Sequence, residues 1–511
     1  MSRDPKSTIL QTDEPVLFYR ALLIIILAIA AVIRFKDCVL PYTWSDEALY
    51  LWCGQRILQN PLLLMSKEVI QYHPPLLPIL IAISNIYFGA NLATHLTGPT
   101  FGVIGVFLVY LLGARLESRF VGLAAAAFLA FDIFHIEYSR RILTDVPMTT
   151  MMLFFAYSLV RWTADGRRRW LVISDISGLL AIMLKWSGAI LLPFLILFHI
   201  AIGLLRKDSK NIIANIFFNC RFTILFIILL LLNNFLKMRS LLPDTTAIGG
   251  FLVTGSPLLY LELFTRSPYY PNSYFLIFFL VGLIVILTGR KKENMVMYLG
   301  WLAVFFVIIA AAKERDPRYI LPIIPFVGLI SAIGLEGVLV RAPKLHKIKV
   351  LPILLIVLFI FDNFRVYPVK MTWLKPVERI GTDFRDAGDW IKTHIDENST
   401  IIASDYRTIR LYSGINLEEF GGQIIRMEDF TELRDFENYV NQTRQKNDIF
   451  LQVDVYNPMQ PKWIFPAEPR KIQRLYKMGF EPVYTGFEEG TEREGQGRAS
   501  LFIFHAKKMR L

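Results

Sequence analysis

Long apolar runs separated by short polar loops dominate the first 360 residues of the chain. A helix needs about 20 apolar residues to cross a bilayer, and about eleven runs approach that length. They cover residues 16–33, 92–112, 120–134, 146–160, 171–184, 187–205, 222–236, 274–288, 295–312, 319–340 and 350–361. The pattern predicts a polytopic α-helical membrane protein with about eleven spans.

The basic residues of the loops predict the orientation of these spans. With the N-terminus in the cytoplasm and the apolar run 74–88 lying at the membrane surface, the inside loops hold 17 Lys and Arg against four Asp and Glu. The outside segments hold 13 basic and 10 acidic residues. Cytoplasmic loops carry an excess of Lys and Arg, so this assignment is favoured. If run 74–88 crossed the membrane, every later loop would change sides and the bias would reverse.

The composition changes after residue 361. Residues 365–511 lack long apolar runs, and "DAGDWIKTHI" has the pattern of an amphipathic helix. The segments "STIIAS", "IFLQVDV" and "SLFIFHA" have the pattern of strands. We therefore predict a transmembrane domain at 1–364, with a first outer loop at 34–91, and a soluble α/β domain at 365–511 on the outer face.

Composition and charge agree with a membrane protein. The 511 residues are 54% hydrophobic and only 19% charged. The net charge of +12 follows mainly from the basic inside loops, which argues against a nucleic-acid partner. Three cysteines, Cys38, Cys53 and Cys220, provide no disulfide framework. The polar start leads directly into the first apolar run, which we expect to remain as an anchor rather than a cleaved signal.

Ionisable residues gather in the predicted outer loops, next to the ends of the spans. Such residues are costly near hydrocarbon, so they suggest a site where they have mutual partners. The loops are "PYTWSDEALYLW", "HIEYSRRILTDVP", "LKWSG" and "KERDPRYILP". Their candidates are Asp46, Glu47, Arg140, Asp145, Lys185, Arg318 and Tyr319, with His73 from "YHPPLLP".

The residue types of these candidates suggest a chemistry. Carboxylates at Asp46, Glu47 and Asp145 could serve as a general base or bind a divalent cation, for which Asp46 and Asp145 are the candidate ligands. The cations Arg140 and Lys185, with Arg318 in the same set, could hold a phosphate. A base and a phosphate clamp at a lipid boundary suggest a lipid-phosphate substrate. No Walker loop, dinucleotide fingerprint or Gly-x-Ser-x-Gly elbow occurs in the chain.

Each candidate also has a structural interpretation. Ser45, Asp46 and Glu47 could open a helix, where acidic residues are favourable. Asp145 could cap the following span, with a proline in its first turn. The arginines at 140 and 141 could extend to lipid headgroups, Lys185 could be an interfacial anchor, and a lone histidine is often structural.

The motifs as a set resemble the protein mannosyltransferase and aminoarabinose transferase superfamily. The similarity rests on "WSDEALYLWCGQRILQNP…YHPPLLPIL", "EYSRRILTDVPMT", "LLAIMLKWSGAILLP" and "RDPRYILPIIPFVGLISAIGLE", and covers roughly residues 16–340. It implies a membrane glycosyltransferase of the C-type fold that uses a polyprenyl-phosphate (dolichyl-phosphate) sugar donor. It also implies acidic positions in the first two outer loops, here Asp46-Glu47 and Asp145.

The family mechanism implies a role for each candidate. Asp46 would take the proton of an acceptor hydroxyl, which attacks the anomeric carbon with inversion and displaces polyprenyl phosphate. Glu47 and Asp145 would orient the acceptor or bind a cation. The clamp Arg140, Lys185 and Arg318 would stabilise the leaving phosphate, and His73 and Tyr319 belong to the same substrate site. Whether a divalent cation takes part is left open.

The C-terminal segment departs from the family pattern, because it does not resemble the lectin-type domain of eukaryotic protein mannosyltransferases. This favours a prokaryotic or archaeal member acting on a glycan, glycolipid or protein at the cell membrane. Three alternatives are considered: a lipid-linked-sugar transporter or flippase, an oligosaccharyltransferase-like enzyme, and a sensor whose bundle only anchors the α/β domain. The sensor would leave the charges of the outer loops unexplained. Internal repeats expected of many transporters are not found, and neither is a Trp-Trp-Asp acceptor motif in the C-terminal domain.

Overall fold

The protein forms two compact units, which we describe separately. The helical bundle contains Met1–Cys38 and Gln59–Leu374, and the α/β unit contains Val39–Leu58 and Lys375–Leu511. The structure, a computed structural model, describes residues 16–36, 45–61, 74–88, 90–235, 273–289, 291–310, 317–341, 382–416, 422–455, 460–487 and 499–508. The acidic segment Val39–Leu58 thus groups with the C-terminal residues, whereas the boundary expected at residue 364 assigns it to the membrane domain.

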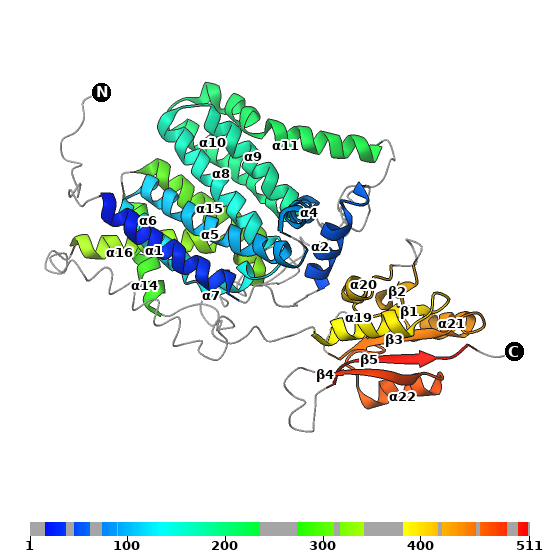
Figure 1. The fold of residues 1–511 in the computed structure, drawn as a ribbon. Helices are drawn as coiled ribbons and strands as arrows, with labels where there is room; N and C mark the ends of the chain where they lie inside the picture. The colour runs from blue at the N-terminus through cyan, green and yellow to red at the C-terminus, as the bar shows by residue number, and fades with distance from the viewer. Residues whose placement is uncertain are drawn as a thin grey trace, which may run out of the picture. The chain divides into compact units, whose positions relative to one another are not determined.

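The predicted spans up to residue 340 overlap helical segments of the bundle, although run 120–134 is divided between two helices, and run 350–361 lies outside the described residues. The helices are α1 (Val16–Phe35), α4 (Leu76–Phe88), α5 (Ala90–Leu116), α6 (Arg119–Ala130), α7 (Ile133–Ser139), α8 (Asp145–Asp165), α9 (Arg169–Leu184), α10 (Leu191–Leu205), α11 (Ile212–Phe235), α14 (Ser273–Thr288), α15 (Lys292–Ala310) and α16 (Ile324–Arg341), with the short 3₁₀ helices η2 (Trp186–Ile190), η3 (Ser209–Asn211) and η4 (Pro317–Ile320). Many of them lie side by side, as Figure 1 shows for α1, α5, α8 and α10.

Several of these helices have the length and apolarity of membrane spans. Among the described residues, four stretches qualify alone: Leu17–Phe35, Thr97–Leu116, Trp186–Leu205 and Ile212–Leu229. A fifth is formed if the bent pair α6–α7 is one span. These helices support the prediction of an integral membrane protein. Helix α4 has 13 residues and a length of about 20 Å, which fits the surface helix expected for run 74–88.

Helix α8 defines two ends of the bundle. Its 21 residues extend about 30 Å, the thickness of the hydrocarbon core. We call the ends the Asp145 end and the Asp165 end, after its first and last residues. Helix α5 lies beside α8 and also packs against α1, α4 and α6.

Glycines allow close contact between bundle helices. A Cβ built on Gly113 of α5 would lie 2.8 Å from the Cα of Gly122 in α6. A Cβ on Gly334 of α16 would collide with the backbone carbonyl of Phe278 in α14. Small residues are favoured at such crossings because membrane helices associate mainly through close packing.

The run predicted as one span at 120–134 is broken in the structure. Helix α6 ends at Ala130, and α7 begins at Ile133 after a bend of 63°. Asp132 caps α7 by accepting a hydrogen bond of 2.7 Å from the His135 backbone N–H. The buried Arg34 of α1 donates to the carbonyls that end α6, including Ala130 O at 3.0 Å. The polar groups freed by the break are therefore satisfied within the bundle.

The α/β unit has a five-stranded mixed sheet in the order β2-β1-β3-β5-β4. Strands β1, β2 and β3 pair in parallel, and β5 is antiparallel to both β3 and β4. The strands are β1 (Thr400–Ala403), β2 (Ile424–Arg426), β3 (Ile449–Asp454), β4 (Glu481–Phe487) and β5 (Ala499–Ala506). The helices are α2 (Ser45–Arg56), α19 (Thr382–His394), α20 (Tyr406–Ser413), α21 (Leu433–Thr443) and α22 (Pro469–Lys477), with the 3₁₀ helix η6 (Met427–Asp429).

Two hydrophobic cores cover the faces of this sheet. Helices α19 and α20 contribute residues such as Ile391 and Ile409 to one core. Helices α21 and α22 contribute Phe436 and Leu475 to the other. The predicted soluble α/β domain is therefore a three-layer structure with helices on both faces.

Candidate active site

Three predicted site residues from separate loops meet at the Asp145 end of the bundle. The Lys185 Nζ atom lies 2.6 Å from Asp145 Oδ1, and it also lies 5.1 Å from the centre of the Tyr319 ring. Only 3% of the Asp145 side chain and 17% of the Lys185 side chain are exposed. A buried carboxylate with a cation at this distance forms a charge-assisted hydrogen bond, and the ring adds a cation–π contact.

A break in the chain positions the lysine. Lys185 ends α9 in an extended conformation (φ −155°, ψ 135°) and is followed directly by η2. The Gly188 N–H donates to Lys185 O at 2.8 Å. A Cβ on Gly188 would lie 2.6 Å from Ala181 O, so the tight return beside α9 requires glycine. The "LKWSG" motif thus places Lys185 where two helices separate.

The Arg140 loop is held against the ends of α1 and α5. Arg140 ends α7 and donates from Nη2 to Lys36 O at 2.9 Å. The next residue, Arg141, pairs with Glu137 at 2.9 Å. A Cβ on Gly98 of α5 would lie 2.5 Å from Arg141 O, which explains the glycine at this position. Arg140 therefore lies in a fixed turn of the same loop that leads into Asp145.

The interpretation of Asp145 as the cap of the span is wrong in detail, because Thr144 is the N-cap residue and Asp145 is the first residue of α8. Asp145 occupies the first turn of α8, where a negative charge is favourable. The cap residue Thr144 makes no side-chain hydrogen bond to the helix. Asp145 thus both stabilises the start of α8 and pairs with Lys185.

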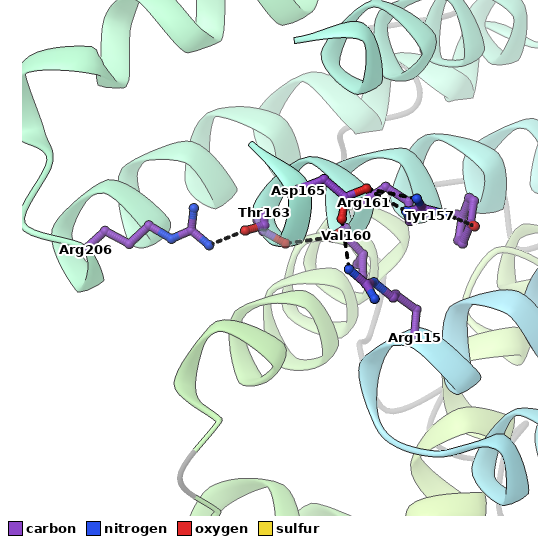
Figure 2. A network of polar contacts seen from close by, with 7 residues as sticks. All are labelled: Arg115, Tyr157, Val160, Arg161, Thr163, Asp165 and Arg206. Atoms are coloured by element: carbon purple, nitrogen blue, oxygen red, sulfur yellow. Dashed lines mark hydrogen bonds and ion pairs between the residues drawn. The ribbon is translucent and has the colours of Figure 1, made fainter. Parts of the chain in front are cut away.

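A second polar network lies at the Asp165 end (Figure 2). Asp165 accepts ion-pair contacts from Arg115 at 3.0 Å and from Arg161 at 2.9 Å. Arg206 donates to Thr163 O at 2.6 Å, as Figure 2 shows. These contacts join the ends of α5, α8 and α10.

Further ion pairs extend this network. Arg206 also contacts Glu293 at 2.7 Å, and Lys291 contacts Glu117 at 3.0 Å. Four of the five loops that the charge pattern assigned to the inside therefore meet at one end of the bundle, and the fifth, 341–349, lies outside the described residues except for its first residue. The four loops are 113–119, 161–169, 206–221 and 290–293.

The acidic pair of the first outer loop belongs to the α/β unit. Asp46 and Glu47 lie in the first turn of α2, in agreement with the helix-start interpretation, and Glu47 is buried. Asp46 Oδ1 accepts a hydrogen bond of 3.0 Å from Arg407 Nη1 of α20. Sequence reasoning missed Arg407, because its partner is 361 positions away and no local pattern connects them.

Two predicted site residues remain, Arg318 and His73. Arg318 lies in η4 beside Tyr319 and is half-buried, and His73 lies outside the described residues. Within the described ranges, no three His, Cys, Asp or Glu side chains form a metal-binding group. The role of Asp46 and Asp145 as ligands of a divalent cation stays a prediction.

Comparisons with known proteins agree with the fold and the motifs. Residues 72–233, which include Asp145 and Lys185, match the dolichyl-phosphate-mannose-protein mannosyltransferase family. A search of curated protein sequences finds no match to the chain.

Two solved structures are similar over most of the chain. ArnT from Cupriavidus metallidurans bound to undecaprenyl phosphate has a TM-score of 0.58 at 13% identity, covering 96% of this chain and 97% of that one. The archaeal oligosaccharyltransferase AglB from Archaeoglobus fulgidus, in complex with an inhibitory peptide and a dolichol-phosphate, has a TM-score of 0.60 at 11% identity. That match covers 94% of this chain and 74% of AglB. Over residues 72–233 the chain matches the dolichyl-phosphate-mannose-protein mannosyltransferase family, and it has the C-type glycosyltransferase fold that its motifs predicted.

Proposed function

We propose that the protein is an inverting glycosyltransferase that moves a monosaccharide from a polyprenyl-phosphate carrier to a hydroxyl acceptor at the outer membrane face. The observation that carries the proposal is the buried Asp145–Lys185 pair beside Tyr319. Both charged residues fall within the region that matches the mannosyltransferase family. The fold is also that of ArnT and AglB, whose structures contain undecaprenyl phosphate and dolichol-phosphate.

In the proposed reaction, the acceptor hydroxyl oxygen attacks the anomeric carbon of the donor sugar. The bond between that carbon and the phosphate oxygen breaks, and its electron pair leaves with polyprenyl phosphate. The Asp46 carboxylate takes the hydroxyl proton. A positioned general base of this kind typically contributes about 10²–10⁴-fold to a rate.

The cations of the Asp145 end would stabilise the leaving phosphate. Asp145 holds the Lys185 ammonium at 2.6 Å, so this cation is ordered before a donor arrives. Arg140 and Arg318 would supply further positive charge. Stabilising the charge that develops on a leaving group is often a large contribution to catalysis when the stabilising groups of the enzyme are already oriented.

The charge of the loops supports an orientation for the site. The Asp165 end gathers the loops rich in Lys and Arg, and such loops face the cytoplasm. The Asp145 end would then face outward. The acceptor would be a glycan, a glycolipid or a protein at that face.

The test is donor turnover by the purified full-length protein in nanodiscs. Release of polyprenyl phosphate from a panel of polyprenyl-phosphate sugars would be measured for the wild type, Asp46→Asn and Asp145→Asn. Asp386→Asn, at an exposed acid on α19, is the matched control. We expect turnover by the wild type and the control, and at least a 100-fold loss in Asp46→Asn, the low end of about 10²–10⁴-fold for a general base.

Two results would contradict the proposal. One is a wild-type protein that consumes none of the donors with any mixture of native lipids and surface glycoproteins. The other is an Asp46→Asn variant as active as the control. In the first case, movement of labelled lipid-linked sugars across proteoliposomes would test the transporter alternative.

A further inference from the structure

The helix that carries the acidic pair is joined to the C-terminal domain by three contacts with α20. Asp46 pairs with Arg407 at 3.0 Å. The Arg410 guanidinium lies 3.8 Å from the centre of the Trp52 ring. Arg56 donates to Gly414 O at 3.3 Å. The contacts follow the same order along both helices, so α2 and α20 run side by side in the same direction.

These contacts are well enclosed. Trp52 and Arg410 are buried, and the side chains of Asp46 and Arg407 are largely so. A guanidinium close above an aromatic ring is favourable, especially when water is excluded. An ion pair that is mostly shielded is also screened less by salt than a surface pair. The contact between α2 and α20 is therefore a stable one.

Helix α20 is itself firmly anchored to the sheet. Asp405 caps it, accepting from the Thr408 N–H at 3.3 Å and the Thr408 hydroxyl at 2.9 Å. The residues just before the helix are held by the buried Gln452 of β3, whose Oε1 accepts from Ser404 N at 2.9 Å. Ile409 of α20 lies in the core between helix and sheet. Arg407 therefore belongs to a helix that is held firmly to the sheet.

We propose that Arg407 is a positioning residue for Asp46. This inference rests on the proposed function, in which Asp46 is the base. A general base must be ionised and correctly oriented when the acceptor hydroxyl attacks. A neighbouring guanidinium favours the ionised carboxylate and fixes its direction.

The proposal predicts a specific kinetic change. Arg407→Gln in the full-length protein removes the charge but keeps a polar side chain of moderate size. We expect kcat to fall about 10- to 100-fold, part of the contribution that a positioned base makes, while KM for the donor changes less than about threefold. Arg407→Lys keeps the charge and should recover part of the lost kcat.

A matched control separates positioning from domain stability. Arg444 also belongs to the α/β unit, but it supports the fold by donating to Met478 O at 2.8 Å and Lys507 O at 3.0 Å. Arg444→Gln should leave kcat within about threefold of the wild type in protein that remains folded at the assay temperature. Thermal unfolding of each variant would establish that condition.

Hydrogen–deuterium exchange gives a readout that does not need activity. Loss of the ion pair should increase exchange in residues 45–56 of Arg407→Gln, with little change in the Arg444→Gln variant. This measurement tests the contact even if no donor is turned over, so failure of the proposed function and failure of this inference are distinguishable.

Several results would overturn the inference. They are unchanged kcat and exchange in Arg407→Gln, a raised donor KM with unchanged kcat, and an equal fall of kcat in Arg444→Gln. The second result would mean that Arg407 contacts the donor instead. If Arg407→Gln does not fold, Arg407→Met, which also lacks the charge, takes its place, and the same results in that variant would refute the inference.

Discussion

The ion pair between Asp145 and Lys185 allows a quantitative test of the site. Its atoms lie 2.6 Å apart, with 3% of the acidic and 17% of the basic side chain exposed. Replacing Lys185 by methionine keeps most of the side-chain volume but leaves Asp145 as a buried, uncompensated charge. Removing one partner of a buried pair typically costs about 3–5 kcal/mol of stability. We expect about 3 kcal/mol for Lys185→Met, because the ammonium is not completely buried.

The double variant distinguishes the stranded charge from lost packing. The double variant Asp145→Asn/Lys185→Met removes both charges of the pair, so its free energy of unfolding should be higher than that of Lys185→Met alone. Replacing a complete buried pair by neutral groups is often close to neutral. The coupling energy from the cycle should therefore exceed 1 kcal/mol, within the range of about 0.5–3 for residues in contact.

The pair Arg206–Glu293 is the control for this cycle. Its atoms lie at a similar distance, 2.7 Å, but its side chains are 35% and 41% exposed. An exposed pair contributes about 0.2–1 kcal/mol, so Arg206→Gln should have a small effect. Unfolding by SDS would be followed by helical circular dichroism. Equal losses for Lys185→Met and Arg206→Gln would refute the argument from burial.

Other predictions concern the supports of the site. Gly98→Ala should lower both stability and donor turnover, because its Cβ would lie 2.5 Å from the Arg141 carbonyl oxygen. Gly300→Ala is the control, because the atom nearest to its Cβ would lie at 3.6 Å, and it should be tolerated in the same thermal unfolding and turnover assays. Arg34→Leu should destabilise the bundle by about 1–3 kcal/mol in SDS unfolding, because it removes the guanidinium that donates to the Leu129 and Ala130 carbonyls, and a variant as stable as the wild type would disprove this. Burial alone raises the pKa of Asp448, but the Lys508 N–H and the His505 ring outweigh it and lower that pKa. The stabilisation by Asp448 is then present above the pKa of this residue in the unfolded chain and is lost as pH falls through its pKa in the folded protein. Asp448→Asn should therefore lower the urea midpoint for unfolding of the sheet at pH 7. A difference in urea midpoint between the variant and the wild type that persists at pH 2 would contradict this.

The sequence determined most of the helical bundle. Apolar runs of near-bilayer length allow little besides a helix, because every backbone polar group in hydrocarbon must be paired within the segment. The predicted runs therefore coincide with helices such as α5 (Ala90–Leu116) and α8 (Asp145–Asp165). The α/β domain was less fully predictable. Strands β1, β3 and β5 have apolar patterns, but β2 has only three residues and β4 is largely exposed.

The sequence also identified candidate site residues, but it did not show which of them contact each other. Charged residues next to span ends identified Asp145 and Lys185 as candidates, since charge near hydrocarbon needs a partner. Only the fold decided that these two residues are each other's partner, 40 positions apart. It also decided the bend after Ala130, where an arginine from α1 pairs with the carbonyls that end α6.

The contact between Asp46 and Arg407 depends most completely on tertiary structure. The local sequence "SDEALYLW" shows an acidic helix start, and "YRTIRLYS" shows a short amphipathic helix. Nothing in either pattern specifies the other, because hydrophobic periodicity and capping report interactions within a few residues along the chain. Which distant helix faces Asp46 is decided by how α20 is fixed to the sheet and how α2 packs beside it, and that is a property of the folded α/β unit.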